Sequence, residues 1–193
     1  MPKIILATTS PYRIEALRFL GIDFEAEGSK IDESQTERND PEELVKTLSR
    51  LKAEAVAKNY SDAIVIGMDS IGYSNGKILE KPKSKEEGYE RLKALSGNNF
   101  QFLTGIWAVN TASHKTVSRV VKTDAVMRDL TDVEINRYLD EDPRFNTYAM
   151  GFDQMGHTSA SFIQEIKGSY NNSLRGIPLE SMREILLEVG YKL

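Results

Sequence analysis

The stretch Ala63-Ile-Val-Ile-Gly-Met68, followed directly by Asp69, carries the strongest fold signal in this chain. The run is short, and its successive side chains, which point to opposite faces of a strand, are all apolar or glycine. This is typical of a central strand that is covered on both faces. Ligands of open α/β sheets gather at the carboxyl ends of strands, so Asp69 is a candidate to hold Mg²⁺ or to take a proton from water. The alternative, of equal weight, is a turn residue that begins the next hairpin.

Helical and extended patterns alternate on both sides of this run. Residues 3–8 predict a buried first strand, and Ser10 before Pro11 is typical of a helix N-terminus, here of a helix from Pro11 to about Leu20. The other expected elements are strands at 22–26, 100–110, 116–127 and 160–166, helices at 41–59, 84–96, 131–140 and 179–189, and a hairpin around Asn75-Gly76. This mixture predicts an α/β domain with a mixed sheet.

Composition excludes several classes of protein. The 193 residues, 40% of them hydrophobic, suit one domain or two lobes that share one core. Acidic residues outnumber basic ones by 29 to 25, which argues against a binder of duplex nucleic acid. The absence of cysteine excludes disulfides, thiolate zinc sites and cysteine nucleophiles. No apolar run approaches the about 20 residues of a membrane span, and no signal peptide is evident, so we expect a cytoplasmic protein.

The beginning of the first helix is a candidate phosphate site. Free backbone N–H groups and the helix dipole attract anions there, Ser10 adds a hydroxyl, and Arg13 adds a guanidinium one turn further on. The segment alone favours the plainer interpretation, an ordinary capped helix with a surface arginine.

Three further charged residues have two interpretations each. Lys52 lies on the flank of the apolar stripe of helix 41–59, where a lysine either extends to solvent or points its ammonium into a cleft beside the core, and the pattern favours solvent. Pro82 biases the backbone of Lys81 toward an extended conformation, and Glu33 lies in a polar stretch. Both residues are first interpreted as parts of solvent-exposed loops. The two histidines have no ligand spacing, so any metal is expected to be a hard cation such as Mg²⁺.

A series of short stretches supports the functional interpretations. In chain order they are Ser10-Pro11-Tyr12-Arg13, Asp32-Glu33, Lys52-Ala53, Gly67-Met68-Asp69-Ser70, Glu80-Lys81-Pro82, Leu95-Ser96-Gly97, Thr104-Gly105, Gly168-Ser169-Tyr170 and Gly176-Ile177-Pro178-Leu179. Their order and separations resemble the Maf family, the septum-formation-like nucleotide pyrophosphatases, over nearly the whole chain. The resemblance implies a single Maf-like domain over residues 1–193, with a mixed sheet, flanking helices and two lobes around a central cleft.

The same resemblance implies an activity. It is hydrolysis of the α–β phosphoanhydride of nucleoside triphosphates, pyrimidine or non-canonical, to a monophosphate and pyrophosphate, by a homodimer that uses Mg²⁺ or Mn²⁺. No nucleic acid or membrane partner is expected. The resemblance implies catalytic roles for Asp69, Lys52 and Lys81, substrate binding by Ser10, Arg13, Glu33 and Gln154, and metal binding by Glu33 and Asp69.

Two departures from the family pattern leave alternatives open. Tyr12 replaces the first arginine of the family pair, which removes one phosphate-binding charge. Gln154 is the counterpart of the family glutamine, although a gapless count back from Phe162 places Gly156 there. These departures motivate a catalytically impaired nucleotide-binding regulator as the second hypothesis, and the family's name suggests a cell-division partner protein as the third.

Overall fold

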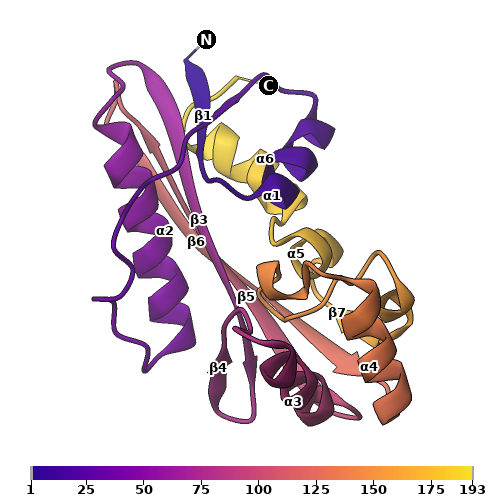
Figure 1. Cartoon of the computed structure of the whole chain (residues 1–193). Coiled ribbons are helices and arrows are strands. Elements are labelled where there is room, and N and C mark those ends of the chain that lie inside the picture. The colour runs from indigo at the N-terminus through magenta and orange to yellow at the C-terminus, as the bar shows by residue number, and fades with distance from the viewer. Residues whose placement is uncertain (1, 193) are drawn as a thin grey trace. The chain divides into compact units, whose positions relative to one another are not determined.

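The computed structural model describes residues 2–192, which form a mixed sheet flanked by helices (Figure 1). The strands are β1 (Lys3–Ala7), β2 (Glu25–Ala26), β3 (Ala63–Ser74), β4 (Lys77–Leu79), β5 (Asn99–Asn110), β6 (Thr116–Met127) and β7 (Ile163–Lys167). They are ordered β2-β1-β3-β5-β6-β7, with β4 paired to β3. The helices are α1 (Pro11–Leu17), α2 (Pro41–Ala57), α3 (Lys85–Leu95), α4 (Asp132–Glu141), α5 (Tyr170–Arg175) and α6 (Leu179–Glu188). The predicted α/β class with a mixed sheet is confirmed.

The described residues divide into two compact units. Residues 2–70, 104–121 and 175–192 form the first unit, and residues 71–103 and 122–174 form the second. Strands β3, β5 and β6 contribute residues to both units. None of the helices within residues 2–192 has the length and apolar character that a membrane crossing requires.

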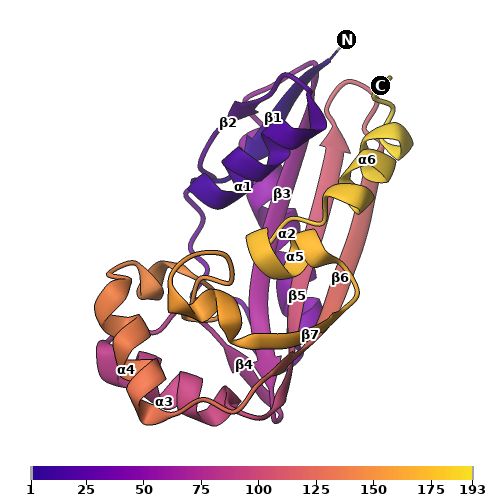
Figure 2. The ribbon, with the colours of Figure 1, turned by 90° about the vertical axis from the view of Figure 1, so that its right-hand side faces the viewer.

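In the first unit, parallel pairing of β1 with β2 and β3 builds the sheet, with Ile5 opposite Val65. Helix α2 covers one face of these strands, and α1 and α6 cover the other (Figures 1 and 2). Each face has its own apolar core, which explains why β3 is apolar on both sides. The core under α1 and α6 includes Leu6, Leu17, Ile66, Ile106, Met182 and Ile185, and the core under α2 includes Ile5, Ala53, Val56 and Val65.

Two glycines allow α2 to lie unusually close to the sheet. A Cβ atom at Gly67 of β3 would stand 2.1 Å from the carbonyl oxygen of Ser49, and one at Gly105 of β5 would stand 2.2 Å from that of Val45. No side chain fits into such gaps, so the backbone of α2 packs directly on the backbones of both strands. Because the helix lies so close, side chains on α2 can reach side chains of the neighbouring strands.

The second unit contains the predicted hairpin and a separate core. Tyr73 pairs with Ile78 and Ser74 with Lys77 around the Asn75-Gly76 turn, which confirms that prediction. Helices α3 and α4 contact each other. The core of this unit is built around aromatic side chains, among them Phe100, Phe102, Tyr138, Phe152 and Phe162.

Several sequence-based predictions need correction, among them the strand expected at 22–26, of which only Glu25–Ala26 is a strand. The strand expected at 63–68 continues to Ser74, so Asp69 lies inside β3 and its interpretation as a turn residue is wrong. The helix expected at 11–20 is α1 followed by a 3₁₀ turn at Arg18–Leu20, and the strand expected at 160–166 begins only at Ile163. Helix α5 was not predicted, because its six residues, Tyr-Asn-Asn-Ser-Leu-Arg, carry no apolar periodicity.

Glu134 at the start of α4 offers a test of local stability. Its carboxylate accepts hydrogen bonds from Arg128 Nη2 at 2.7 Å and from the backbone N–H of Thr131 at 2.8 Å, and these bonds lower its pKa to about 2. Since that pKa lies below the ordinary value of 4.5, the stabilisation is complete above pH 4.5 and is lost as pH falls toward 2. We expect Glu134→Ala to lower the free energy of unfolding by about 1 kcal/mol at pH 7, with the surface ion pair adding little.

Urea titrations of Glu134→Ala and the parent protein at pH 7 and pH 3 provide the measurement. The difference in unfolding free energy should shrink at the lower pH. A difference that does not depend on pH would mean that the charge of this carboxylate contributes nothing.

Candidate active site

Asp69 is a buried carboxylate in the middle of β3. It is 8% exposed and follows the apolar run that begins at Ala63. Burial raises the pKa of Asp69 above its ordinary value, and the nearby charges of Lys52 and Arg13 oppose that rise without cancelling it. A buried carboxylate with a raised pKa and a specific charge partner is a typical candidate for proton transfer.

Lys52 of α2 provides that charge partner. Its Nζ atom donates to Asp69 Oδ1 at 2.6 Å and lies 2.9 Å from Glu33 Oε1. The lysine side chain is only 14% exposed, so the interpretation that it extends to solvent is wrong. The reason is tertiary: Gly67 lets α2 lie against β3, and from that distance the lysine reaches the carboxylate two residues further along the strand.

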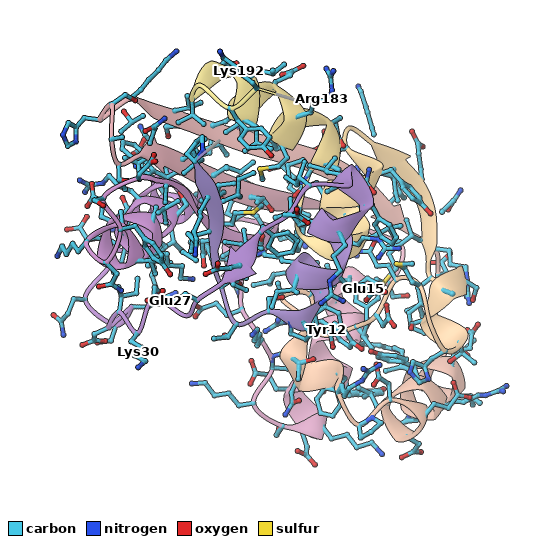
Figure 3. All side chains as sticks on the ribbon, turned by 90° about the horizontal axis from the view of Figure 1, so that it is seen from above. Tyr12, Glu15, Glu27, Lys30, Arg183 and Lys192 are labelled. Carbon is cyan, nitrogen blue, oxygen red and sulfur yellow. The ribbon has the colours of Figure 1, made fainter. Side chains whose placement is uncertain are left out.

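Glu33 joins the cluster from the long segment between β2 and α2. Figure 3 labels Glu27 and Lys30, which begin this segment. Next to Glu33, the backbone N–H of Ser34 donates to Asp32 Oδ1 at 3.0 Å, which folds the segment into a turn. The side chain of Glu33 is 43% exposed, so this carboxylate is far more accessible to solvent than that of Asp69.

Ser10 and Arg13 lie at the beginning of α1, as predicted. The side chain of Ser10 accepts from the backbone N–H of Arg13 at 3.5 Å and so caps the helix. The guanidinium of Arg13 donates to the carbonyl of Met68 at 3.0 Å, directly before Asp69 in the chain. Tyr12, which replaces the family arginine, is half-buried on the same helix as Glu15 (Figure 3).

Lys81 and Gln154 belong to the second unit. Lys81 is exposed in the connection between β4 and α3, next to the buried Pro82. Gln154 Oε1 accepts a hydrogen bond from Ser173 Oγ of α5 at 2.8 Å. Within the first unit, Lys52 contacts Asp69 and Glu33, Arg13 bonds to the residue before Asp69, and Ser10 caps the helix that carries Arg13.

Sequence reasoning missed three residues next to Asp69. Ser70 Oγ accepts from Arg13 Nη2 at 2.6 Å and lies 2.7 Å from Thr104 Oγ1, while the carbonyl of Gly176 accepts from Arg13 Nε at 3.1 Å. All three positions fall in the short stretches that carry the family resemblance. The order of these stretches along the chain was the available signal, because the residue types alone indicate no role.

The two carboxylates of the cluster fit one kind of metal binding. Within residues 2–192, no group of three or more His, Cys, Asp or Glu side chains is placed to hold an ion by itself. Mg²⁺ in proteins commonly takes one or two carboxylates and completes its shell with substrate phosphates and water. Glu33 and Asp69 fit an ion that is shared with a polyphosphate, and they do not form a cage of their own.

Asp69→Asn separates the cost of the buried charge from its use. A carboxylate whose pKa is raised by folding destabilises the native state as pH rises from its ordinary pKa of 3.8, and the full cost is present above the raised pKa. We therefore expect Asp69→Asn to unfold at a higher temperature than the parent protein at pH 7 in the presence of a metal chelator. Each kcal/mol recovered should add about 2–4 °C for a chain of this size.

Scanning calorimetry of both proteins from pH 7 to pH 4 measures this effect. The gap in unfolding temperature should narrow as the pH falls and Asp69 becomes protonated. An Asn variant that is less stable than the parent at pH 7 would mean that the ion pair with Lys52 outweighs the cost of burial.

The fold has relatives among solved structures. The Staphylococcus aureus Ham1 protein matches with a TM-score of 0.55 and 16% identity, over 96% of this chain and 98% of that chain. A HAM1 protein from Coxiella burnetii gives a TM-score of 0.53 and 14% identity, over 97% and 100% of the two chains. The protein therefore belongs to the class of α/β proteins with the Ham1 fold.

The sequence places the chain in a family within that class. The family model for Maf-like proteins matches residues 3–189, and the chain belongs to this family. A dTTP/UTP pyrophosphatase from Alkaliphilus metalliredigens is 38% identical over 188 residues, 96% of this chain and 95% of that protein. A 7-methyl-GTP pyrophosphatase from Pseudomonas aeruginosa is 36% identical over 193 residues and the full length of both.

Proposed function

We propose that this protein is a nucleoside triphosphate pyrophosphatase, which cleaves the α–β phosphoanhydride to yield a monophosphate and pyrophosphate. The observation that carries the proposal is the ammonium of Lys52, held 2.6 Å from the buried Asp69 and 2.9 Å from Glu33. Full-length similarity to proteins named as nucleotide pyrophosphatases supports the same reaction.

Asp69 has the properties that the attacking water requires. In the proposed reaction a water oxygen attacks the α-phosphorus in line, the bond from that phosphorus to the bridging oxygen breaks, and pyrophosphate leaves with the bonding electrons. Asp69 orients this water and accepts its proton, which its raised pKa favours. Lys52, next to the carboxylate, offsets negative charge that grows on the phosphate oxygens.

The remaining roles extend the proposal to the ends of the substrate. Ser10 and the positive end of the α1 dipole bind phosphate oxygens, and the family resemblance gives Lys81 the role of offsetting charge on the leaving pyrophosphate. The resemblance likewise gives Gln154 the role of a contact to the nucleotide. Glu33 and Asp69 would hold Mg²⁺ or Mn²⁺, and the ion when bound would supply Lewis-acid polarisation of the phosphates.

The relatives do not favour one base over another. The two named activities occur in proteins of nearly the same similarity, at 38% and 36% identity. Both pyrimidine triphosphates and 7-methyl-GTP are therefore candidate substrates.

The oligomeric state and the location, a homodimer in the cytoplasm, stay predictions of the family resemblance. Light scattering and cell fractionation test those two points.

A pyrophosphate release assay tests the proposal. The purified protein is incubated with Mg²⁺ or Mn²⁺ and a panel that contains UTP, dTTP, CTP, GTP and 7-methyl-GTP, with a chelator control. We expect pyrophosphate and a monophosphate from at least one base. Orthophosphate as the product would place the attack on another phosphorus, while tight binding in calorimetry without any product would favour the nucleotide-binding regulator.

A further inference from the structure

The guanidinium of Arg13 donates hydrogen bonds to three acceptors of the protein. Nε donates to the carbonyl of Gly176 at 3.1 Å, Nη1 to the carbonyl of Met68 at 3.0 Å, and Nη2 to Ser70 Oγ at 2.6 Å. Two of these acceptors belong to the residues immediately before and after Asp69. Arg13 therefore holds β3 from both sides of the carboxylate.

Ser70 connects the hydrogen bonds of Arg13 to two further elements. Its hydroxyl lies 2.7 Å from Thr104 Oγ1 of β5 and 3.5 Å from the carbonyl of Gly176, which precedes α6. Gly176 has a φ of +63°, and a Cβ atom there would come within 3.3 Å of Ser70 Oγ. Helix α1, strands β3 and β5 and the turn before α6 thus converge on one partly buried hydrogen-bond network.

This geometry differs from that of a phosphate-binding arginine. Such an arginine offers a pair of parallel N–H groups to two oxygens of the ligand. Here the edge formed by Nε and Nη2 already faces Gly176 and Ser70. Burial lowers the pKa of Arg13, and the charges of Asp69 and Glu33 oppose that effect.

We propose that Arg13 is a positioning residue, which fixes the Asp69 carboxylate against Lys52 by clamping Met68 and Ser70, and that it is not a substrate phosphate ligand. The proposal deepens the proposed function and depends on it for its kinetic consequences. A displacement of Asp69 by about 1 Å is enough to cost on the order of 10²-fold in rate when geometry is critical.

Kinetics of variants of Arg13 and Ser70 distinguish the two roles. We expect Arg13→Gln and Ser70→Ala each to lower kcat by about 10- to 100-fold while KM changes by less than about threefold. Ser70→Thr keeps the hydroxyl and should retain most of the activity. Free guanidinium ion should partly restore kcat in Arg13→Ala, and Arg18→Gln, in the exposed 3₁₀ turn after α1, is the matched control.

A readout without turnover keeps this proposal separate from the proposed function. Hydrogen–deuterium exchange in Arg13→Gln should be faster than in the parent at residues 67–71 and 174–178, with no change in α4. If the parent protein hydrolyses no triphosphate, the proposed function fails, and the exchange result alone decides whether Arg13 holds this part of β3.

Two results would overturn the positioning role. One is a rise in KM of about tenfold or more in Arg13→Gln at unchanged kcat, with Ser70→Ala behaving like the parent, which is the pattern of a phosphate ligand. The other is unchanged exchange at residues 67–71 in Arg13→Gln.

Discussion

Replacing Lys52 with methionine should lower kcat/KM for pyrophosphate release by about 10²- to 10³-fold, the loss typical when one charge-stabilising donor is removed. Methionine keeps most of the length and the apolar stem of lysine, and it removes the ammonium that lies 2.6 Å from Asp69 and 2.9 Å from Glu33. Asp69→Asn should lose a similar factor, since general-base catalysis contributes about 10²- to 10⁴-fold. Steady-state kinetics on the best triphosphate of the panel give both values.

Lys58→Met is the matched control for this experiment. Lys58 is the exposed residue at the C-terminal end of the same helix, so its loss changes the net charge equally without touching the cluster. We expect kcat/KM of this variant within about twofold of the parent, in line with the small effects of exposed substitutions. A Lys52→Met protein with parental turnover would remove Lys52 from the mechanism.

Gly67→Ala should be the most disruptive change outside the charged cluster. The added methyl group would stand 2.1 Å from Ser49 O and 2.5 Å from Ala53 N, and both are backbone atoms of α2 that cannot turn aside. The helix must move away from β3, at a cost of about 3 kcal/mol or more in unfolding free energy. Because Lys52 moves with the helix, activity should fall even at temperatures where the variant is fully folded.

Gly88→Ala controls for the size of the substitution. A methyl group on this buried glycine of α3 would meet only side-chain atoms, 3.1 Å from Leu139 and 3.3 Å from Phe145. These side-chain ends can shift, and alanine is favoured over glycine in a helix by about 1 kcal/mol, so we expect a change in stability below about 1 kcal/mol. Urea unfolding and kinetics of both variants test the contrast. A Gly67→Ala protein as stable as the parent would show that α2 can move without loss of packing.

Most of the helices and strands could be predicted from local signals. Asn75-Gly76 marks a hairpin because asparagine and glycine tolerate positive φ, and φ is 49° at Asn75 and 76° at Gly76. Asp40 before Pro41 marks the beginning of α2, where its carboxylate accepts from two backbone N–H groups. The boundary at Met68 was wrong because the polar Asp69 and Ser70 interrupt the apolar run, although the strand continues through them.

The side-chain directions at the site depended on tertiary packing. For Lys52 the helical pattern favoured solvent, and for Arg13 an ordinary surface position, yet both side chains point at β3. A position on the flank of an apolar stripe is compatible with either direction, because periodicity describes one helix and not its distance from a sheet. That distance is set by Gly67 and Gly105, whose missing side chains admit α2.

The sequence by itself therefore determined the α/β class, the caps, the hairpin and, through the order of its short stretches, the family. Those features depend on neighbouring residues in the chain, whose interactions are local. Only the tertiary structure decided that the ammonium of Lys52 lies between the carboxylates of Glu33 and Asp69. It also decided that the guanidinium of Arg13 bonds to β3 on both sides of Asp69. Such contacts link residues far apart in the sequence, and the backbone separation that permits them is a property of the packed protein.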